Sequence, residues 1–362
     1  MRKALRIFGI FVLSIILIHL IVVVYIWINN KSYLERVKLE NVEYLKANST
    51  TVSQTEIDDE FFEAALDDTF YDSNIFLLGE SHGFADVQNI DFALLKHLNK
   101  KEGVRFYIAE MDKELGAKLN KYLTDSIENK ELLAEVVFSL KSRIPQQASK
   151  ELFKKWESVR AYNLTLPDSV RINVLGIDKD YDDSSTQVPR DSMMVKNLAE
   201  AVADYDLQGE KFYGLFGHFH VMQEPVGNSS AAPFGARLKR SNLDFLNRVS
   251  SLVVYHIDSE VYFPENEQFP TPGDEKIGFL NNDGPITLVK GINDLEAISG
   301  PNTVTLSVLN KATSPYRKSQ ALAGIKVNFF GNDLLPKSPG AATTDCFQYV
   351  ILGRNSEALT KY

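Results

Sequence analysis

The sequence predicts an α/β protein, in which a mostly parallel sheet is flanked by helices on both faces and is preceded by one N-terminal transmembrane helix. Two patterns predict this fold class. Short apolar runs bounded by turn residues alternate with longer segments of helical periodicity, an order typical of βαβ units. In addition, residues 7–28 contain no Asp, Glu, Lys or Arg, and a helix of that length crosses a hydrocarbon core of about 30 Å.

The first unit of the chain, residues 1–30, is predicted to be a cytoplasmic tip followed by a signal anchor. The apolar run exceeds the roughly 7–15 residues of a signal peptide and lacks a small-residue cleavage site, so we expect it to stay uncleaved. Basic residues precede it without any acidic residue: Arg2, Lys3 and Arg6. This bias places the N-terminus in the cytoplasm. We therefore expect a single-pass protein, held in the membrane through residues 7–28, whose main domain is periplasmic or on the outer face.

The remainder divides into a tether of mixed helix and coil, residues 31–58, and one α/β domain, residues 59–362. Buried strands are predicted at 75–78, 104–109, 171–177, 212–216 and 252–257. Helices are predicted at 61–66, 87–99, 113–123, 130–141, 149–162 and 191–203. Further short β-like runs in the C-terminal third can complete the sheet: 304–309, 325–330 and 349–352.

Composition excludes several classes of protein. Lys and Arg number 39 against 48 Asp and Glu, for a net charge of −9, which argues against nucleic acid as a partner. The single cysteine, Cys346, rules out an intramolecular disulfide framework and a cysteine-based zinc site. The chemistry of this chain therefore falls to histidine and carboxylate side chains.

Reactive side chains follow four of the predicted strands. The first strand is followed by Glu80, Ser81 and His82, the second by Glu110, the third by Asp178, and the fourth by His218 and His220. Because ligands bind at the carboxyl ends of the strands in an open parallel sheet, we expect these residues to share one site.

Glu80 and His82 are separated by one residue, so in extended backbone they point to the same side. A carboxylate beside an imidazole raises its basicity and fixes its tautomer. Such a pair can form a general base for water or supply metal ligands. Asp86 and Asp191 each begin a predicted helix, which is a position typical of helix caps.

A nucleophilic serine is an alternative. Residues 79–83 match the G-x-S-x-G elbow between a strand and a helix, with Ser81 as nucleophile. Asp178 and either His220 or His256 would complete the triad in the expected chain order. The position of the motif argues against it, because an α/β-hydrolase places several strands before its nucleophile and few precede Ser81 here.

Several motifs together resemble the erythromycin esterase family and its wider superfamily, which includes ChaN-like and Tiki/TraB-type proteins. They are LLGESHG at 77–83, Trp156, Arg160 and Asn163, VRINVLGID at 170–178, RDSMMVKNL at 190–198, and GHFH at 217–220. The resemblance covers about Glu60 to Ile257. It implies a hydrolase with an α/β domain whose best-matching catalytic positions are Glu80, His82, Glu110 and His220, supported by Ser81, Asp178, Arg190, Asp191 and His218.

The chain departs from the esterase pattern at two points. One residue, Ser81, lies between Glu80 and His82, where the esterases have two, and the G-E-x-H form is that of ChaN-like proteins. The Asn of the esterase histidine turn is missing, and Gly217-x-x-His220 resembles the G-x-x-H of Tiki/TraB-type proteins, which include metal-dependent proteases. These departures argue against a macrolide as the substrate.

We therefore expect a membrane-anchored hydrolase that activates water with histidine and glutamate to cleave an ester, lactone or amide in a small molecule or peptide. A divalent metal held by His82, Glu110 and His220 can take the activating role instead. One alternative is a ChaN-like protein that binds haem or a metal complex through His and Tyr ligands. The others are a serine hydrolase using Ser81 and a structural anchor with a degenerate site.

Overall fold

A computed structural model describes residues 2–180, 187–227, 232–243, 245–264, 275–278, 280–328 and 331–362. The helices are α1 Arg2–Leu34, α2 Leu39–Ala47, α3 Asp59–Ala65, α4 Asp68–Tyr71, α5 Asp86–Glu102, α6 Lys113–Thr124, α7 Lys130–Ser139, α8 Lys150–Asn163, α9 Arg190–Asp204, α10 His218–Val221, α11 Phe234–Lys239, α12 Ile292–Glu296 and α13 Thr343–Cys346. The strands are β1 Ser49–Ser53, β2 Ile75–Glu80, β3 Phe106–Ala109, β4 Asn173–Gly176, β5 Phe212–Gly217, β6 Val249–Ile257, β7 Val261–Phe263, β8 Glu275–Ile277, β9 Thr287–Val289, β10 Thr303–Val308, β11 Ile325–Val327 and β12 Tyr349–Arg354.

An eight-stranded sheet forms the centre of the domain, in the order β1-β10-β12-β6-β2-β5-β3-β4. The six strands from β12 to β4 are parallel to their neighbours, whereas β10 is antiparallel to both β1 and β12. All five predicted strands between residues 75 and 257 lie in this sheet. The predicted mostly parallel sheet is therefore confirmed.

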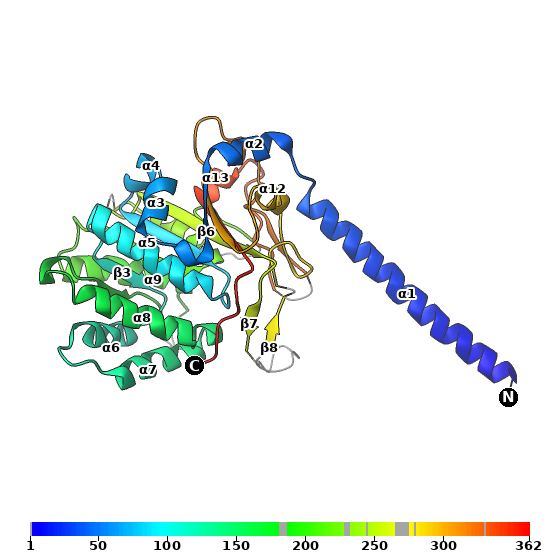
Figure 1. Cartoon of the computed structure of the whole chain (residues 1–362), viewed down its shortest axis with the longest axis horizontal. Helices are drawn as coiled ribbons and strands as arrows, with labels where there is room; N and C mark the ends of the chain where they lie inside the picture. The colour runs from blue at the N-terminus through cyan, green and yellow to red at the C-terminus, as the bar shows by residue number, and fades with distance from the viewer. Residues whose placement is uncertain are drawn as a thin grey trace.

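Helices cover both faces of the sheet, as predicted. Phe76 and Leu78 of β2 pack on one face among side chains of α3 and α5–α8, and Ile75 and Leu77 pack on the other among side chains of α9, α11 and α12. Figure 1 shows α3, α5 and α8 stacked beside the sheet. Both sets of side chains are fully buried because β2 is a central strand whose alternate residues face opposite layers.

The C-terminal third only partly completes the sheet. Residues 304–309 and 349–352 lie in β10 and β12, as expected, but β11 pairs with β9 in a separate two-stranded ribbon. The last two residues of the predicted run, 329–330, lie outside the described residues. β11 and β9 form hydrogen bonds with each other in antiparallel orientation and not with a strand of the main sheet, so they make a separate ribbon.

The segment 31–58 differs from the expected tether. It contains α2, which buries Leu45, and β1, which forms the edge of the main sheet beside β10. The sequence lacks a strong apolar period here because one side of β1 is exposed to solvent. Polar residues of β1 also pair with polar residues of β10, as Ser49 Oγ and Ser307 Oγ do at 2.6 Å. The domain therefore begins close to the end of α1.

One helix is long and apolar enough to cross a membrane, Arg6–Leu34, among the residues that the structure describes. It stands clear of the domain as the dark blue helix in Figure 1, with the side chains of its apolar residues exposed. This helix is compatible with a single-pass anchor or a signal sequence, as expected from residues 7–28.

Candidate functional site

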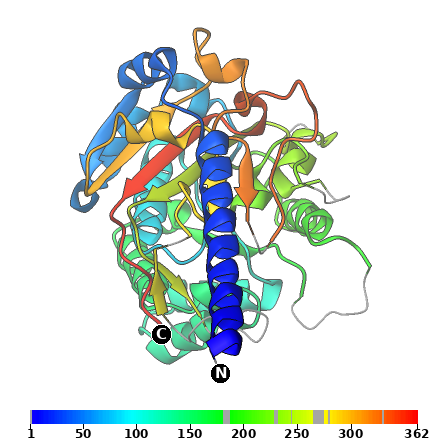
Figure 2. The ribbon, with the colours of Figure 1, turned by 90° about the vertical axis from the view of Figure 1, so that its right-hand side faces the viewer.

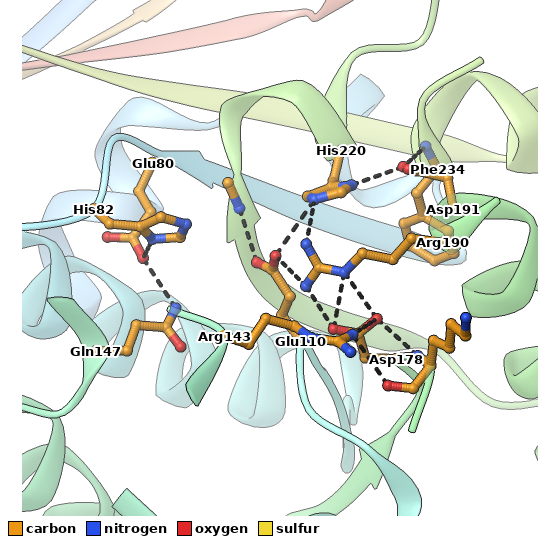
Figure 3. A network of polar contacts seen from close by, with 12 residues as sticks. Glu80, His82, Glu110, Arg143, Gln147, Asp178, Arg190, Asp191, His220 and Phe234 are labelled. Atoms are coloured by element: carbon orange, nitrogen blue, oxygen red, sulfur yellow. Dashed lines mark hydrogen bonds and ion pairs between the residues drawn. The ribbon is translucent and has the colours of Figure 1, made fainter. Parts of the chain in front are cut away.

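The carboxyl ends of β2, β5, β3 and β4 bring the predicted residues to one edge of the sheet. Glu80 ends β2, Glu110 follows β3, Asp178 follows β4, and His218 and His220 follow β5. Most of them line one cavity of about 430 Å³. Figure 3 shows two sets of polar contacts in this region, one around Glu80 and His82 and one that joins Glu110, Asp178, Arg190, Asp191 and His220.

Glu80 holds His82 in a defined tautomer. His82 Nδ1 lies 2.8 Å from Glu80 Oε1, and because a carboxylate only accepts, this nitrogen carries the proton. The Glu80 side chain is 1 % exposed and that of His82 is 22 % exposed. Burial lowers the pKa of His82, but the charge and hydrogen bond of Glu80 outweigh burial and raise the pKa. The pair therefore presents Nε2 of a strengthened base toward the cavity.

The second imidazole of the cavity, His220, is held by Asp191. His220 Nδ1 lies 2.7 Å from Asp191 Oδ1, and its Nε2 lies 3.4 Å from Glu110 Oε1. Burial lowers the pKa of His220, but the charge of Glu110 and the hydrogen bond to Asp191 raise it to about 9. The raised pKa favours the imidazolium form of His220 at neutral pH, in contrast to an ordinary histidine.

Glu110 is ionised and buried between cationic groups. Its Oε2 accepts a hydrogen bond from Gly217 N at 3.0 Å, and its Oε1 lies 2.8 Å from Arg190 Nη2. Burial raises the pKa of Glu110, but His220 and Arg190 lower it well below its usual range. A charged carboxylate at this position fixes the protonated state of His220.

Arg190 joins the ends of β3, β4 and β5. Its Nε donates to Asp178 Oδ1 at 2.9 Å, its Nη2 donates to Glu110, and its Nη1 lies 3.2 Å from His220 Nε2. Asp178 is fully buried, and a buried carboxylate without a counter-charge is costly. Arg190 therefore supplies the counter-charge that allows two acidic residues to lie together at the sheet edge.

Two residues that the sequence did not single out also reach the site. Arg143 Nη1 lies 3.0 Å from Asp178 Oδ1, and Gln147 Nε2 donates to Glu80 Oε1 at 3.4 Å. Both lie in the short helical turns after α7, Leu140–Ser142 and Pro145–Gln147, or next to them. No spacing in the sequence marks this segment, because its residues reach the site only through the packing of α7 and α8.

The serine triad expected around Ser81 does not form. Ser81 Oγ lies 3.3 Å from His218 Nδ1, whereas His220 pairs with Asp191 and His256 pairs with Asp86. His218 Nε2 lies 2.7 Å from Val254 O, so a backbone carbonyl holds it where a triad has a carboxylate. Burial lowers the pKa of His218 to about 3. The expected partner Asp178 is engaged by Arg190.

Gly217 lets the two imidazoles of the cavity approach each other. A Cβ atom at this position would lie 3.2 Å from His82 Nε2 and 3.7 Å from His220 Cδ2. Among the residues that the structure describes, no protein group hydrogen-bonds His82 Nε2. The glycine therefore keeps the basic nitrogen accessible from the cavity.

The metal alternative does not fit these side chains. Within the described parts of the chain, no group of three or more His, Cys, Asp or Glu is arranged to hold a metal ion. The Arg190 guanidinium contacts both Glu110 and His220, two of the three expected ligands, so its positive charge competes with a cation bound by this pair.

Haem does not fit the histidines either. Four histidines of the domain have a ring nitrogen engaged by a protein group: His97 by Tyr71, His218 by Val254, His220 by Asp191 and His256 by Asp86. A Cβ atom at Gly217 would lie 3.2 Å from His82 Nε2, so the backbone approaches this nitrogen closely. These contacts leave few ring nitrogens for a haem iron.

Asp86 pairs with a buried histidine and does not cap α5. Ala85 is the N-cap residue and makes no side-chain cap, while Asp86 Oδ1 lies 2.8 Å from His256 Nε2. The His256 ring stacks on Phe84 with centroids 3.9 Å apart. The helix-cap prediction was therefore wrong for Asp86, because the end of β6 places an imidazole above the first turn of α5. Asp191 likewise binds His220 and leaves α9 without a side-chain cap.

Other motif residues of the resemblance hold the fold together. Arg160 donates to the backbone oxygens of Tyr122 and Asp125, each at 2.6 Å. Asn163 pairs its amide with both backbone groups of Ile172 at 2.9 Å. These contacts fix α8 to the segment before β4, so these residues position the sheet and do not enter the cavity.

Comparison with known proteins gives a likeness of fold. No protein-family model and no curated protein matches the chain. A crystal structure of a Bacillus cereus protein matches with a TM-score of 0.63 and 12% identity, over 89% of this chain and 98% of that one. A succinoglycan biosynthesis protein matches with a TM-score of 0.61 and 13% identity, over 91% and 100%. An erythromycin esterase variant in its open conformation matches with a TM-score of 0.51 and 12% identity, over 85% and 98%. The chain therefore shares the fold of an erythromycin esterase.

Proposed function

We propose that this protein is a membrane-anchored hydrolase that activates water with a histidine and glutamate pair and cleaves an ester, lactone or amide. One observation carries the proposal. The cavity holds a base, His82 oriented by Glu80, and an acid, His220 held protonated by Glu110 and Asp191. Hydrolysis of an acyl bond needs both, since a proton leaves the water and another reaches the leaving group. The erythromycin esterase fold supports the same reaction class.

The reaction runs through these two imidazoles. His82 Nε2 takes a proton from water as the water oxygen bonds to the carbonyl carbon. The guanidinium groups of Arg143 and Arg190 line the cavity and offer positive charge to the developing oxyanion. When the acyl bond breaks, the leaving oxygen or nitrogen takes the proton of His220 Nε2. The cycle closes when the proton on His82 returns through solvent to His220.

Substitution tests the assignment. We expect His82→Ala and His220→Ala to lower hydrolysis of a panel of esters and peptides by about 10²–10⁴-fold, the usual contribution of general acid–base catalysis. Glu110→Ala should also lower hydrolysis, because the pKa of His220 falls without the charge of Glu110 and His220 then loses its proton. His97→Ala serves as the control, because His97 bonds Tyr71 on α4, away from the cavity. Retained hydrolysis in all three cavity variants would refute the proposal.

The serine alternative has its own test. Ser81 lines the cavity and contacts His218, which is the observation that favours it. A Ser81 nucleophile predicts near-complete loss of hydrolysis in Ser81→Ala, together with an acyl-enzyme visible by mass spectrometry. Water activation by His82 predicts that Ser81→Ala keeps most of its activity and forms no acyl-enzyme.

Membrane anchoring, with the N-terminus in the cytoplasm and the domain outside, belongs to the proposal. The single cysteine, Cys346, is fully buried, so a Lys154→Cys variant carries an accessible thiol at an exposed site. A membrane-impermeant maleimide should label this variant in intact cells. Labelling that appears only after lysis would place the domain in the cytoplasm, and recovery in the soluble fraction would exclude the anchor.

A further inference from the structure

The end of α1 is fastened to a ribbon that also forms a wall of the cavity. The ribbon consists of β9 and β11, which pair antiparallel from Thr287 with Val327 to Val289 with Ile325. Asn30, in the last turns of α1, donates to Pro285 O at 3.2 Å, and its Oδ1 accepts from Asn328 Nδ2 at 3.0 Å. Pro285 lies two residues before β9, and Asn328 follows β11 directly.

The attachment continues to the last residue of the helix. Leu34 is 8 % exposed and belongs to the same core layer as Leu288, which lies on the face of β9 opposite to Thr287. Its carbonyl accepts a hydrogen bond from Gly291 N at 3.0 Å. Beyond it, Glu35 lies 3.5 Å from Lys290. The transmembrane helix is thus joined to the domain by buried contacts, with no free tether between them.

The opposite side of the same ribbon faces the catalytic groups. Thr287, Ile325, Val327 and Leu334 line the cavity together with Glu80, His82, Glu110, Arg143, Arg190 and His220. One wall of the cavity is therefore largely apolar and the other is charged. An amphiphile matches such a cavity, with its alkyl part on the ribbon and its polar group at the imidazoles.

The position of the ribbon relative to the bilayer follows from the helix. Asn30 comes two residues after the end of the apolar run at Ile28, which is about 3 Å along a helix. Because Asn30 touches the ends of the ribbon, the ribbon lies at the depth of the lipid headgroups when α1 spans the membrane. Figure 2 shows α1 in front of the domain and Figure 1 shows that it leads away from the domain at this attachment, with its apolar residues exposed.

We propose that the substrate is a membrane amphiphile, an ester with a long acyl chain whose carbonyl lies at the headgroup level. This inference rests on the proposed hydrolase function and on the anchor. The alkyl chain lies against Ile325 and Val327 while the carbonyl reaches His82. Water adds to that carbonyl, the bond from carbon to the alcohol oxygen breaks, and the alcohol leaves with the proton of His220, which yields a fatty acid and an alcohol.

The test compares two fluorogenic esters on the full-length protein in phosphatidylcholine vesicles. One is 4-methylumbelliferyl oleate dispersed in the bilayer, and the other is 4-methylumbelliferyl acetate in the water phase. We expect a higher kcat/KM for the oleate. Hydrolysis of the acetate alone would overturn the membrane substrate and leave the hydrolase standing, whereas hydrolysis of neither ester would overturn both.

A variant with a spacer after the apolar run changes the distance of the domain from the bilayer and leaves the catalytic groups unchanged. Ten Gly/Ser residues inserted between Ile28 and Asn29 keep every contact of Asn30 but lift the domain from the bilayer. The oleate rate in vesicles should fall by at least about tenfold, because withdrawing two methylenes from the bilayer already costs that factor. The acetate rate should not change. An unchanged oleate rate in vesicles would overturn the proposal.

A wall variant tests the ribbon itself. Val327→Asp puts a charge on the apolar wall, so we expect the ratio of oleate to acetate hydrolysis to fall by at least about tenfold. The matched control is Leu164→Asp, which places the same charge on an exposed leucine at the end of α8 and should leave the ratio unchanged. An unchanged ratio in Val327→Asp would overturn the role of the ribbon. Circular dichroism confirms that both variants are folded.

Discussion

His220 makes the free energy of unfolding of this protein depend on pH, and a substitution of His220 should remove this part of the pH dependence. Its side chain is 11 % exposed and is held by Asp191 at 2.7 Å and by Glu110 at 3.4 Å. These carboxylates raise its pKa in the folded protein to about 9, against about 6.5 in the unfolded chain. The perturbation is His220→Gln, which keeps a polar side chain of similar reach and removes the titrating group.

The sign and size of the effect follow from linkage. A group whose folded pKa is raised stabilises the fold fully below its unfolded pKa, and this contribution is lost as pH rises through the folded pKa. The shift of about 2.5 pKa units is worth about 3 kcal/mol. The free energy of unfolding of the wild type should therefore fall by about 3 kcal/mol more than that of His220→Gln between pH 6.5 and pH 9.5.

Urea unfolding of the full chain in detergent, followed by fluorescence of the buried Trp156, measures this difference. A Trp27→Phe background removes the tryptophan of α1. His97→Gln is the control, because burial lowers the pKa of His97, so the free-energy contribution of that imidazole changes with pH in the opposite direction and by less than about 0.5 kcal/mol above pH 6.5. If the wild type and His220→Gln differ by the same free energy at pH 6.5 and pH 9.5, the protonated state assigned to His220 is wrong.

Three further outcomes are expected. Lys155→Met should lower the free energy of unfolding by about 3 kcal/mol, because Lys155 lies 2.7 Å from the fully buried Asp91. The double variant Lys155→Met with Asp91→Leu should regain part of the lost free energy. A double variant that is less stable than Lys155→Met alone would contradict this. Gly217→Ala should reduce hydrolysis by at least about tenfold with a small change in the urea midpoint, since its Cβ would stand 3.2 Å from His82 Nε2; normal kinetics would contradict it. Dialysis against EDTA should leave hydrolysis unchanged, with metal content followed by mass spectrometry, and restoration of lost activity by one divalent ion would show that a metal takes part.

Local pattern predicted much of the fold. Residues 75–78 and 212–216 lack charged side chains along their whole length because both faces of a central parallel strand are buried. Such a run of consecutive residues can be recognised from the sequence alone. The pairing of β9 with β11 could not be read in this way, since it depends on two segments far apart in the chain. β1 was missed for a related reason: its Ser and Thr residues at 49, 51 and 53 are paired with Ser307, Thr305 and Thr303 of β10, and only the register reveals these partners.

The sequence by itself determined the membrane-compatible helix, the α/β class and the chemical types at the strand ends, because each depends on the order of neighbouring residues. The spacing of Glu80 and His82 also predicted their pairing, which the structure contains. Only the tertiary structure decided the other pairs: it placed His220 beside Asp191, and Arg190 beside Glu110, which was considered as a metal ligand. It also joined α1 to a wall of the cavity. Partners of this kind are separated by up to hundreds of residues, so their distances and protonation are fixed by packing around the sheet and not by any local pattern.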